Sequence, residues 1–249
     1  MKTSTPRCSG ARLYCDLPLS PGAEISLPES AARHAVTVLR LQVGDALDLF
    51  NGAGGEYRAN LIAVNKHAAR VRVAEFRSIE RESPLAITLA LGISAGERMD
   101  YSLQKATELG VAAIAPLATE RSLVKLTAER ADRRLQHWQN VVIAACEQCG
   151  RNRVPAVAPV QTLFKYLAQT GSGERRLLLS PDAATALKAV ARPAAAVLLI
   201  GAEGGLTQAE REAAEASGFE AVNLGPRILR TETAPVAALA ALQTLWGDL

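Results

Sequence analysis

The sequence predicts an α/β protein whose larger part is a parallel sheet, preceded by a small β-rich domain. In the first seventy-odd residues, short alternating apolar runs are separated by turn signals. From residue 85 onward, strand-like runs alternate with helical patterns, which is typical of a parallel sheet covered on both sides. Near the C-terminus, two glycine-containing turns each follow an apolar run, as do the ligand-binding turns of open α/β sheets.

The first domain is expected over residues 1–77 as a small β-barrel-like unit. Turns such as Pro21-Gly22 separate its strands. A short helix is expected over residues 30–39, with Ser30 or Glu29 near its N-terminal cap. The strands are predicted at residues 12–17, 46–50, 56–64 and 69–76. A charged stretch near residues 78–84 is a plausible linker to a second domain over residues 78–249.

The second domain is expected to begin with a buried strand, because residues 85–91 are almost continuously apolar. Gly110 and Gly150 stand where two helical patterns stop, and glycine commonly follows the last turn of a helix. Helices are predicted at residues 97–109, 128–149 and 235–246. Further strands are predicted at residues 111–117, near 157, and at 177–179, 194–200 and 220–224.

Composition indicates an ordinary globular protein, with 49% hydrophobic and 21% charged residues in 249. No apolar run approaches the roughly 18 residues that a membrane span needs. The first residues lack the apolar core of a secretory signal. A cytoplasmic protein without a membrane partner is therefore expected.

Four cysteines are too few for a disulfide framework in a chain of this length. Cys146 and Cys149 have the spacing of a zinc knuckle or redox pair, but they lie at the end of a predicted helix. Cys8 and Cys15 supply no second pair of that spacing, and His67 is one of only three histidines. Two reduced thiols are favoured over a redox pair, and no metal is expected.

The basic excess lies mostly in the middle of the chain, whereas residues 201–249 are acidic. Clustered cations suit phosphate contacts, although a solvated helix face of mixed charge is an equal alternative. The notable cations are Arg121, Lys125, Arg130, Arg133, Arg134, Arg151 and Arg153.

The two glycine turns cover residues 200–207 (IGAEGGLT) and 224–233 (LGPRILRTET). Without a Cβ, glycine lets the backbone approach a ligand closely, so the pair predicts a cofactor site built largely from main chain. The first turn is not G-x-G-x-x-G, and no G-x-x-x-x-G-K-[ST] occurs. A dinucleotide fingerprint and a P-loop are therefore unsupported.

These strings, in this order, resemble the SPOUT methyltransferases of the ribosomal RNA small subunit methyltransferase E type. Residues 34–45, 96–110 and 145–155 also resemble that family, so the resemblance covers nearly the whole chain. One departure is Ala202, where the family usually has proline. The resemblance implies a PUA-like RNA-binding domain, then a trefoil-knotted parallel sheet, and a homodimer. It further implies S-adenosylmethionine as cofactor and N3 of a uridine in 16S ribosomal RNA of the small ribosomal subunit as methyl acceptor.

An imide nitrogen is a poor nucleophile until its proton leaves, so the site is expected to hold a cation and a proton acceptor. Arg230 is the candidate cation, and Glu232 or Glu203 the candidate acceptor. Glu232 alternatively caps the last helix or pairs with Arg230, and Glu203 alternatively orients its loop. The expected cofactor-binding residues are Leu179, Ser180, Gly201, Glu203, Gly204, Leu224, Gly225, Ile228 and Leu229.

RNA contacts are expected from the first domain and from basic residues of the second. The candidates are His34, Arg40, Arg121, Arg151 and Arg153. A structural histidine and solvated charges remain the alternatives, and Arg98 and Lys105 are weighed in the same way.

Three rival functions remain at this point. One is a SPOUT enzyme that methylates a ribose 2′-hydroxyl or a tRNA purine. Another is an RNA-binding assembly factor without catalysis, against which the intact loop residues argue. A nicotinamide-dependent oxidoreductase is the most distant, because the sequence has no glycine fingerprint early in the sheet.

Overall fold

A computed structural model describes residues 10–65, 68–124, 127–169 and 173–249. Cys8, His67 and Lys125 lie outside these ranges. The chain divides into two compact units. The first unit comprises residues 1–82 and 146–154, and the second comprises residues 83–145 and 155–249. The sequence places a single break near residue 77, whereas the structure returns residues 146–154 to the first unit.

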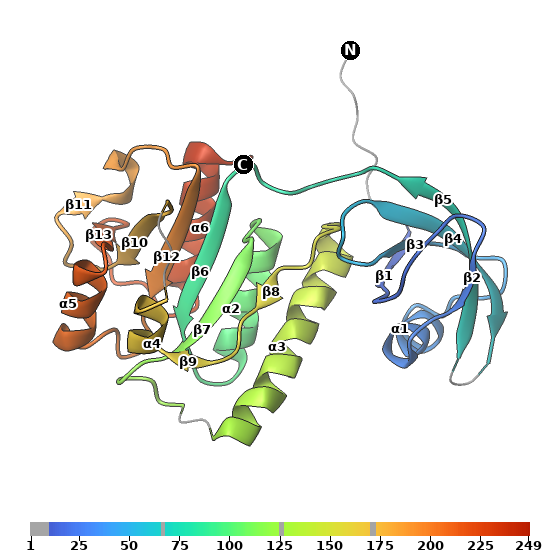
Figure 1. Ribbon diagram of the computed structural model, residues 1–249, viewed down its shortest axis with the longest axis horizontal. Coiled ribbons are helices and arrows are strands. Elements are labelled where there is room, and N and C mark those ends of the chain that lie inside the picture. Colours follow the sequence, from blue (N-terminus) through green and yellow to red (C-terminus); the bar gives the residue numbers. More distant parts are fainter. Residues whose placement is uncertain (1–9, 66–67, 125–126, 170–172) are drawn as a thin grey trace, which may run out of the picture. The chain divides into compact units, whose positions relative to one another are not determined.

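The first unit is built on a five-stranded sheet in the order β1-β3-β4-β5-β2 (Figure 1). β1 and β3 are parallel, and the other neighbours are antiparallel. Two register shifts between β4 and β5 bend these long strands, as bulges do. The strands are β1 (Ala11–Tyr14), β2 (Glu24–Ser26), β3 (Ala46–Phe50), β4 (Glu56–Val64) and β5 (Ala69–Arg77). Four of the five were predicted; β2 is too short to show an alternating pattern.

The predicted helix over residues 30–39 is present in two parts. α1 (Glu29–Arg33) continues into a π-helical turn, η1 (His34–Val38). The wider turn is visible in the bond from the Leu39 amide to the His34 carbonyl, 3.0 Å over five residues. Arg40 then takes a positive φ of 55°, which ends the segment.

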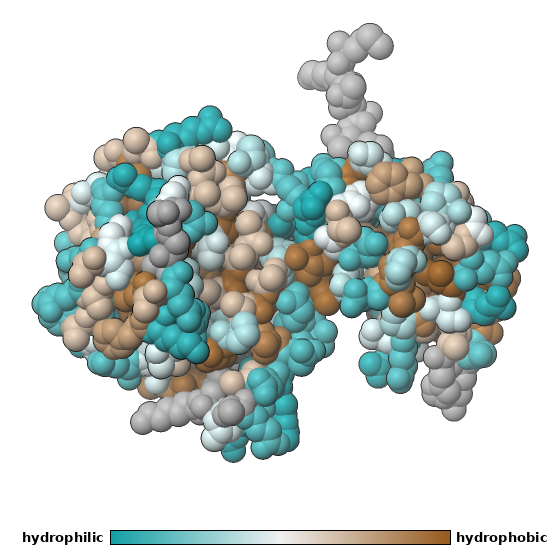
Figure 2. Space-filling model, in the orientation of Figure 1, coloured by the Kyte–Doolittle hydropathy of each residue, from teal (hydrophilic) through white to brown (hydrophobic). Residues whose placement is uncertain are grey.

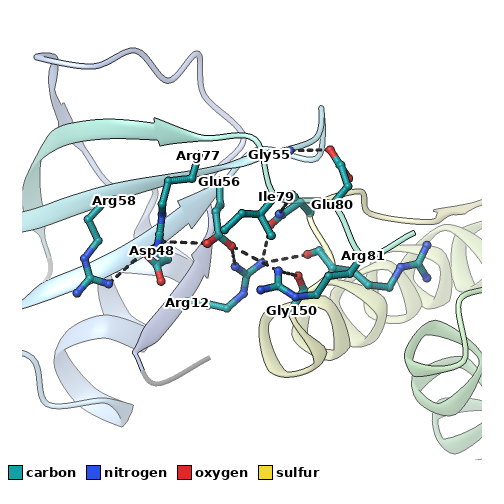
Figure 3. Close-up of polar contacts among 12 residues, drawn as sticks. Arg12, Asp48, Gly55, Glu56, Arg58, Arg77, Ile79, Glu80, Arg81 and Gly150 are labelled. Carbon is teal, nitrogen blue, oxygen red and sulfur yellow. Dashed lines mark hydrogen bonds and ion pairs between the residues drawn. The ribbon is translucent and has the colours of Figure 1, made fainter. Parts of the chain in front are cut away.

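A buried ion pair explains why residues 146–154 belong to the first unit (Figure 3). The guanidinium of Arg12 binds the Glu56 carboxylate, and both side chains are almost fully buried. The second nitrogen of Arg12 donates to the Arg151 carbonyl at 3.1 Å and to Asn152 Oδ1 at 2.7 Å. Arg81 donates to the Gly150 carbonyl at 2.9 Å. A buried guanidinium needs acceptors for its donors, and the backbone carbonyl of Arg151 and the side chain of Asn152 supply them from a distant part of the chain.

The second unit holds an eight-stranded sheet in which every neighbouring pair is parallel. The order is β11-β13-β10-β12-β6-β7-β8, and β9 also pairs with β7. The strands are β6 (Ala86–Gly92), β7 (Ala113–Ala118), β8 (Ala156–Val157), β9 (Gln161–Thr162), β10 (Arg175–Leu179), β11 (Thr185–Ala186), β12 (Ala195–Ile200) and β13 (Glu220–Asn223).

Helices cover both faces of this sheet, as predicted. In β12, Val197 and Leu199 join a core cluster with residues of α4 and α5, while Leu198 and Ile200 alternate with them and are equally buried. α2 packs against α6, and both lie behind the sheet in the view of Figure 1. The helices are α2 (Glu97–Glu108), α3 (Ala128–Cys149), α4 (Leu163–Leu167), α5 (Gln208–Ala216) and α6 (Thr233–Trp246), with a short 3₁₀ turn, η2 (Leu187–Ala189).

Hydrophilic side chains cover much of the molecular face shown in Figure 2. Among the described residues, no helix is long and apolar enough to cross a membrane. Within the same ranges, no group of three or more His, Cys, Asp and Glu side chains is arranged to hold a metal ion.

Burial raises the pKa of the Cys146 thiol to about 12, so this thiol is protonated and unreactive at neutral pH.

Candidate active site

A cavity of about 350 Å³ lies at the carboxyl ends of β10, β12 and β13. In this parallel sheet Leu179 of β10 pairs with Val222 of β13, and Leu178 pairs with Leu199 of β12. The segments after the three strands therefore leave the sheet at one edge and meet there. All nine residues predicted to bind a cofactor line this cavity, together with Pro181, Asp182, Ile200, Ala202, Gly205, Arg211, Arg227, Thr231 and Ala234.

The first loop, residues 201–206, is a tight turn that depends on glycine. The Gly205 amide donates to the Ala202 carbonyl at 2.8 Å, and Gly205 has a positive φ of 67°. A Cβ on Gly201 would lie 2.9 Å from the Gly205 carbonyl carbon. At the end of β6, a Cβ on Gly92 would lie only 2.3 Å from the Ala202 nitrogen. Glycine at these positions lets main chain pack directly on main chain.

Glu203 anchors this loop to the segment that precedes α2. Its Oε1 accepts from the Ala95 amide at 2.9 Å and from Arg98 Nη1 at 3.3 Å. Burial raises the pKa of Glu203, but hydrogen bonds from the amides of Ala95 and Glu203 and from Arg98 outweigh it and leave the pKa below its usual value. Its Oε2 is buried and has no hydrogen-bond partner among the described residues. Glu203 is therefore a carboxylate with one oxygen satisfied and one available to a donor.

Arg98 connects the two glycine loops, a role that the sequence did not reveal. Besides Glu203, its Nε lies 3.9 Å from Oε2 of Glu232. Nearby, Ser94 Oγ and Thr231 Oγ1 are hydrogen-bonded at 3.0 Å. The segment after β6 therefore contacts both loops. The three segments are far apart in the sequence, and the fold brings them together.

The second loop, residues 224–231, is fixed at its beginning by Asn223. The Asn223 side chain accepts from the Gly225 amide at 3.0 Å and donates to the Ala183 carbonyl at 2.7 Å. Gly225 has a positive φ of 110°, which glycine adopts without strain. Farther along, Ile228 is 85% exposed although it lines the cavity, so its side chain stands at the cavity mouth.

The three candidate catalytic residues lie in different surroundings. Arg230 is exposed, and its guanidinium has no hydrogen bond or ion pair with another described residue. It stands between Leu229 and Thr231, which both line the cavity. Glu232 occupies the N-cap position of α6 but makes no capping hydrogen bond. Its ion-pair partner is Arg98, not the Arg230 considered from the sequence.

The candidate RNA residues of the first unit divide into accessible and inaccessible ones. Arg40 and Arg153 are exposed, and Arg153 lies 3.6 Å from Glu80. His34 is partly exposed, with Nδ1 3.3 Å from Glu147. Arg151 is 4% exposed and binds Glu82 in a buried ion pair, so its guanidinium does not face solvent where RNA would bind. The expectation of an RNA contact from Arg151 is corrected: it is a structural residue, because the fold of the first unit buries it.

In the second unit, Arg121 is exposed but contacts the first glycine loop. Its Nη1 donates to the Gly204 carbonyl at 3.2 Å and to the Leu206 carbonyl at 3.4 Å. Two further residues that line the cavity, Asp182 and Arg211, were not predicted from the sequence. Arg211 Nη1 lies 3.6 Å from Asp182 Oδ2. Asp182 lies shortly after the end of β10 at Leu179, so its position just past a predicted strand was the available signal.

Comparison with known proteins agrees with this architecture. A family described as the RNA methyltransferase domain matches residues 81–243, and one described as the RNA methyltransferase PUA domain matches residues 27–74. The ribosomal RNA small subunit methyltransferase E of Buchnera aphidicola is 36% identical over 96% of this chain and 97% of its own.

Two solved structures are similar over almost the whole chain. The ribosomal RNA small subunit methyltransferase E of Neisseria gonorrhoeae, bound to S-adenosyl methionine, has a TM-score of 0.91 and 44% identity. A methyltransferase from Legionella pneumophila, in complex with the bound cofactor SAM, has a TM-score of 0.93 and 40% identity. Each comparison covers 96% of this chain and 99% of the other. The first unit thus contains a PUA-like domain and the second a SPOUT methyltransferase domain, and the chain belongs to the ribosomal RNA small subunit methyltransferase E family.

Proposed function

We propose that this protein transfers a methyl group from S-adenosylmethionine to N3 of a uridine in 16S ribosomal RNA. The observation that carries the proposal is the cavity between three loops at the carboxyl ends of parallel strands. Family membership supports the ribosomal RNA of the small subunit as the substrate. The sequence alternatives of an inactive assembly factor and an oxidoreductase lose support, since neither accounts for both the loops and the relatives.

The residues of the cavity fit this cofactor. Glycine backbone and the apolar side chains of Leu179, Leu224 and Leu229 suit an adenine ring and a thioether chain. The cofactor carries positive charge, and Glu203 offers an ionised carboxylate whose Oε2 has no partner among the described residues. We assign Leu179, Ser180, Gly201, Glu203, Gly204, Leu224, Gly225, Ile228 and Leu229 to cofactor binding. When bound, S-adenosylmethionine supplies an electrophilic methyl group.

The protein's own residues must make the uracil imide nucleophilic. N3 becomes a good nucleophile when its proton leaves, and the negative charge then spreads onto the two carbonyl oxygens. Arg230 stands unpaired beside the cavity, so we assign it to bind those oxygens and stabilise the anion.

Between the two candidate proton acceptors, the hydrogen bonds favour Glu232. The bonds to Glu203 stabilise its charged form and so make it a weak base, which suits loop anchoring and cofactor binding. Among the described residues, Glu232 makes no capping hydrogen bond, and its charged partner is Arg98 at 3.9 Å. We propose that Glu232 accepts the N3 proton while Arg98 holds its carboxylate in place.

We also propose that Arg40, Arg153 and His34 contribute to RNA binding by residues 1–77 and their neighbours, and that residues 78–249 supply the catalytic domain. Family resemblance supports a homodimer, a trefoil knot near the C-terminus and a cytoplasmic location, where ribosomal RNA is found.

Product analysis tests the proposal directly. The protein is incubated with tritiated S-adenosylmethionine and small ribosomal subunits from a strain that lacks this modification, and the RNA is digested to nucleosides. Label in 3-methyluridine is expected. Label in a 2′-O-methyl nucleoside would retain the fold but overturn the acceptor. Absence of label with cofactor binding intact would refute the proposed substrate, and absence of cofactor binding would favour a non-catalytic protein.

A further inference from the structure

Arg121 is an exposed arginine whose contacts point inward, toward the first glycine loop. Its Nη1 lies 3.2 Å from the Gly204 carbonyl oxygen and 3.4 Å from that of Leu206. These carbonyls flank Gly205, the residue with positive φ. The contact is close along the whole side chain, because a Cβ on Gly204 would lie 2.8 Å from the Arg121 Cβ. One side chain thus spans the turn of the loop.

The backbone around Arg121 is fixed on both sides. The Glu120 amide donates to Glu210 Oε1 at 2.9 Å, and Oε2 of the same carboxylate accepts from the Thr207 amide at 2.9 Å. Glu210 is only 1% exposed, so this link is shielded from water. On the other side, Ser122 Oγ donates to the Ile93 carbonyl at 2.7 Å. Arg121 therefore lies in a segment whose backbone is hydrogen-bonded through Glu210 to the start of α5.

We propose that Arg121 is a positioning residue for the cofactor loop, and that it holds Gly204–Leu206 in the conformation that receives S-adenosylmethionine. The inference rests on the proposed function. Gly204 and Gly205 line the cavity, so a shift of either changes the shape of the cofactor site. A guanidinium suits this task because Nη1 alone carries two N–H donors, one for each carbonyl, and the group keeps its charge at every physiological pH.

The role differs from that of a phosphate-binding arginine, which its exposure and charge alone suggest. Arg130 on α3 is the matched comparison. It is also exposed and basic, but its side chain has no hydrogen bond or ion pair with another residue in the part of the chain that the structure describes. The two arginines should therefore separate cofactor binding from RNA binding.

The test measures cofactor affinity without RNA, using Arg121→Ala, Arg121→Lys and, as control, Arg130→Ala. Calorimetry gives the Kd for S-adenosylmethionine, and amide hydrogen exchange of residues 203–207 is followed in the cofactor-free protein. Arg121→Ala is expected to raise Kd about tenfold and to speed exchange in the loop, since it removes charge-assisted bonds to two carbonyls. Arg121→Lys should lie between, and Arg130→Ala should match wild type.

RNA binding by the same variants tests the alternative role of Arg121, a direct contact with an RNA phosphate. Affinity for 16S ribosomal RNA transcribed in vitro is measured across a series of salt concentrations, because each lost phosphate contact flattens the slope. Arg121→Ala should keep the wild-type slope. A reduced slope with unchanged Kd for S-adenosylmethionine and unchanged exchange would overturn the proposal and assign Arg121 to RNA.

The wild-type protein shows whether the proposed function itself is wrong, independently of the role of Arg121. If the wild-type protein itself does not bind S-adenosylmethionine, the function is wrong before any variant is compared. Should Arg121→Ala fail to fold, Arg121→Lys decides, because it keeps the charge on a side chain that is one atom shorter and does not reach both carbonyls as Nη1 does. A wild-type Kd and wild-type loop exchange in the lysine variant would then overturn the positioning role.

Discussion

Replacing Gly92 with alanine tests whether close contact between two backbones sets the shape of the active site. Gly92 ends β6, and a Cβ there would lie 2.3 Å from the Ala202 nitrogen and 2.8 Å from the Gly201 carbonyl carbon. Ordinary contact begins at 3.4 Å, so the first loop must move by about 1 Å. The obstructing atoms are main chain, and rotation of a side chain cannot remove the clash.

The expected losses of stability and activity follow from this displacement. Inserting a methyl group into a fully packed site typically costs about 1–3 kcal/mol. For a chain of this size, that lowers Tm by about 2–4 °C for each kcal/mol. Activity should suffer more than stability, because a displacement of about 1 Å in a reacting group lowers the rate as much as about 100-fold. The Kd for S-adenosylmethionine should rise as well, since Gly201 and Ala202 line the cavity.

Thermal unfolding, calorimetry with S-adenosylmethionine and methyl transfer to small subunits would be measured on the same preparation. Gly10→Ala is the control, because a Cβ at Gly10 would be in ordinary contact with two side chains among the described residues, Arg58 Nη1 at 3.5 Å and Asp48 Oδ2 at 3.9 Å. It should behave as wild type in all three assays. A Gly92→Ala protein with wild-type Tm, Kd and turnover would show that the loop tolerates the shift, and the reasoning would be refuted.

Two further predictions concern the charged residues of the site. Arg230→Ala should leave the Kd for S-adenosylmethionine almost unchanged but lower turnover about 100-fold or more, since it stabilises only the developing anion; equal turnover would remove Arg230 from the mechanism. Glu203→Gln should weaken cofactor binding about tenfold in calorimetry at pH 7, because a neutral amide replaces a carboxylate. Wild-type binding should stay constant down to about the ordinary carboxyl pKa of 4.5 and decline only below it, because the pKa of Glu203 is lowered. The same group contributes stability above that pH and loses it as pH falls through the lowered pKa. Wild-type binding that declines between pH 7 and pH 5 would contradict the assignment.

Much of the architecture could be read from local patterns. The strands over residues 46–50 and 56–64 and the helix over residues 128–149 appear with the predicted bounds. Each is long enough to show its hydrophobic period, or is bounded by glycine or another turn signal. Elements that are too short for a period were missed, among them β2, β9, α4 and β11. In η1, the π-helical turn also escaped prediction, since its hydrogen bonds depend on geometry that no residue pattern records.

The positions of the two glycine loops were predictable for the same reason. Glycine turns after apolar strands are local signals, and parallel strands bring their carboxyl ends to one edge whatever else the chain does. All nine residues expected to bind a cofactor consequently line one cavity.

The partners of the charged side chains were decided only by tertiary structure. Arg121, Arg151 and Arg98 are alike in sequence, but one spans a glycine loop, one is buried against Glu82 and one connects Glu203 with Glu232. The sequence determines that these groups are charged and roughly where the two glycine loops lie. Which acceptors each arginine meets depends on segments far away along the chain, as with Arg98 and Glu203, which are 105 residues apart. Long-range packing sets these distances, and a charge carries no local signal of which distant partner the fold will bring to it.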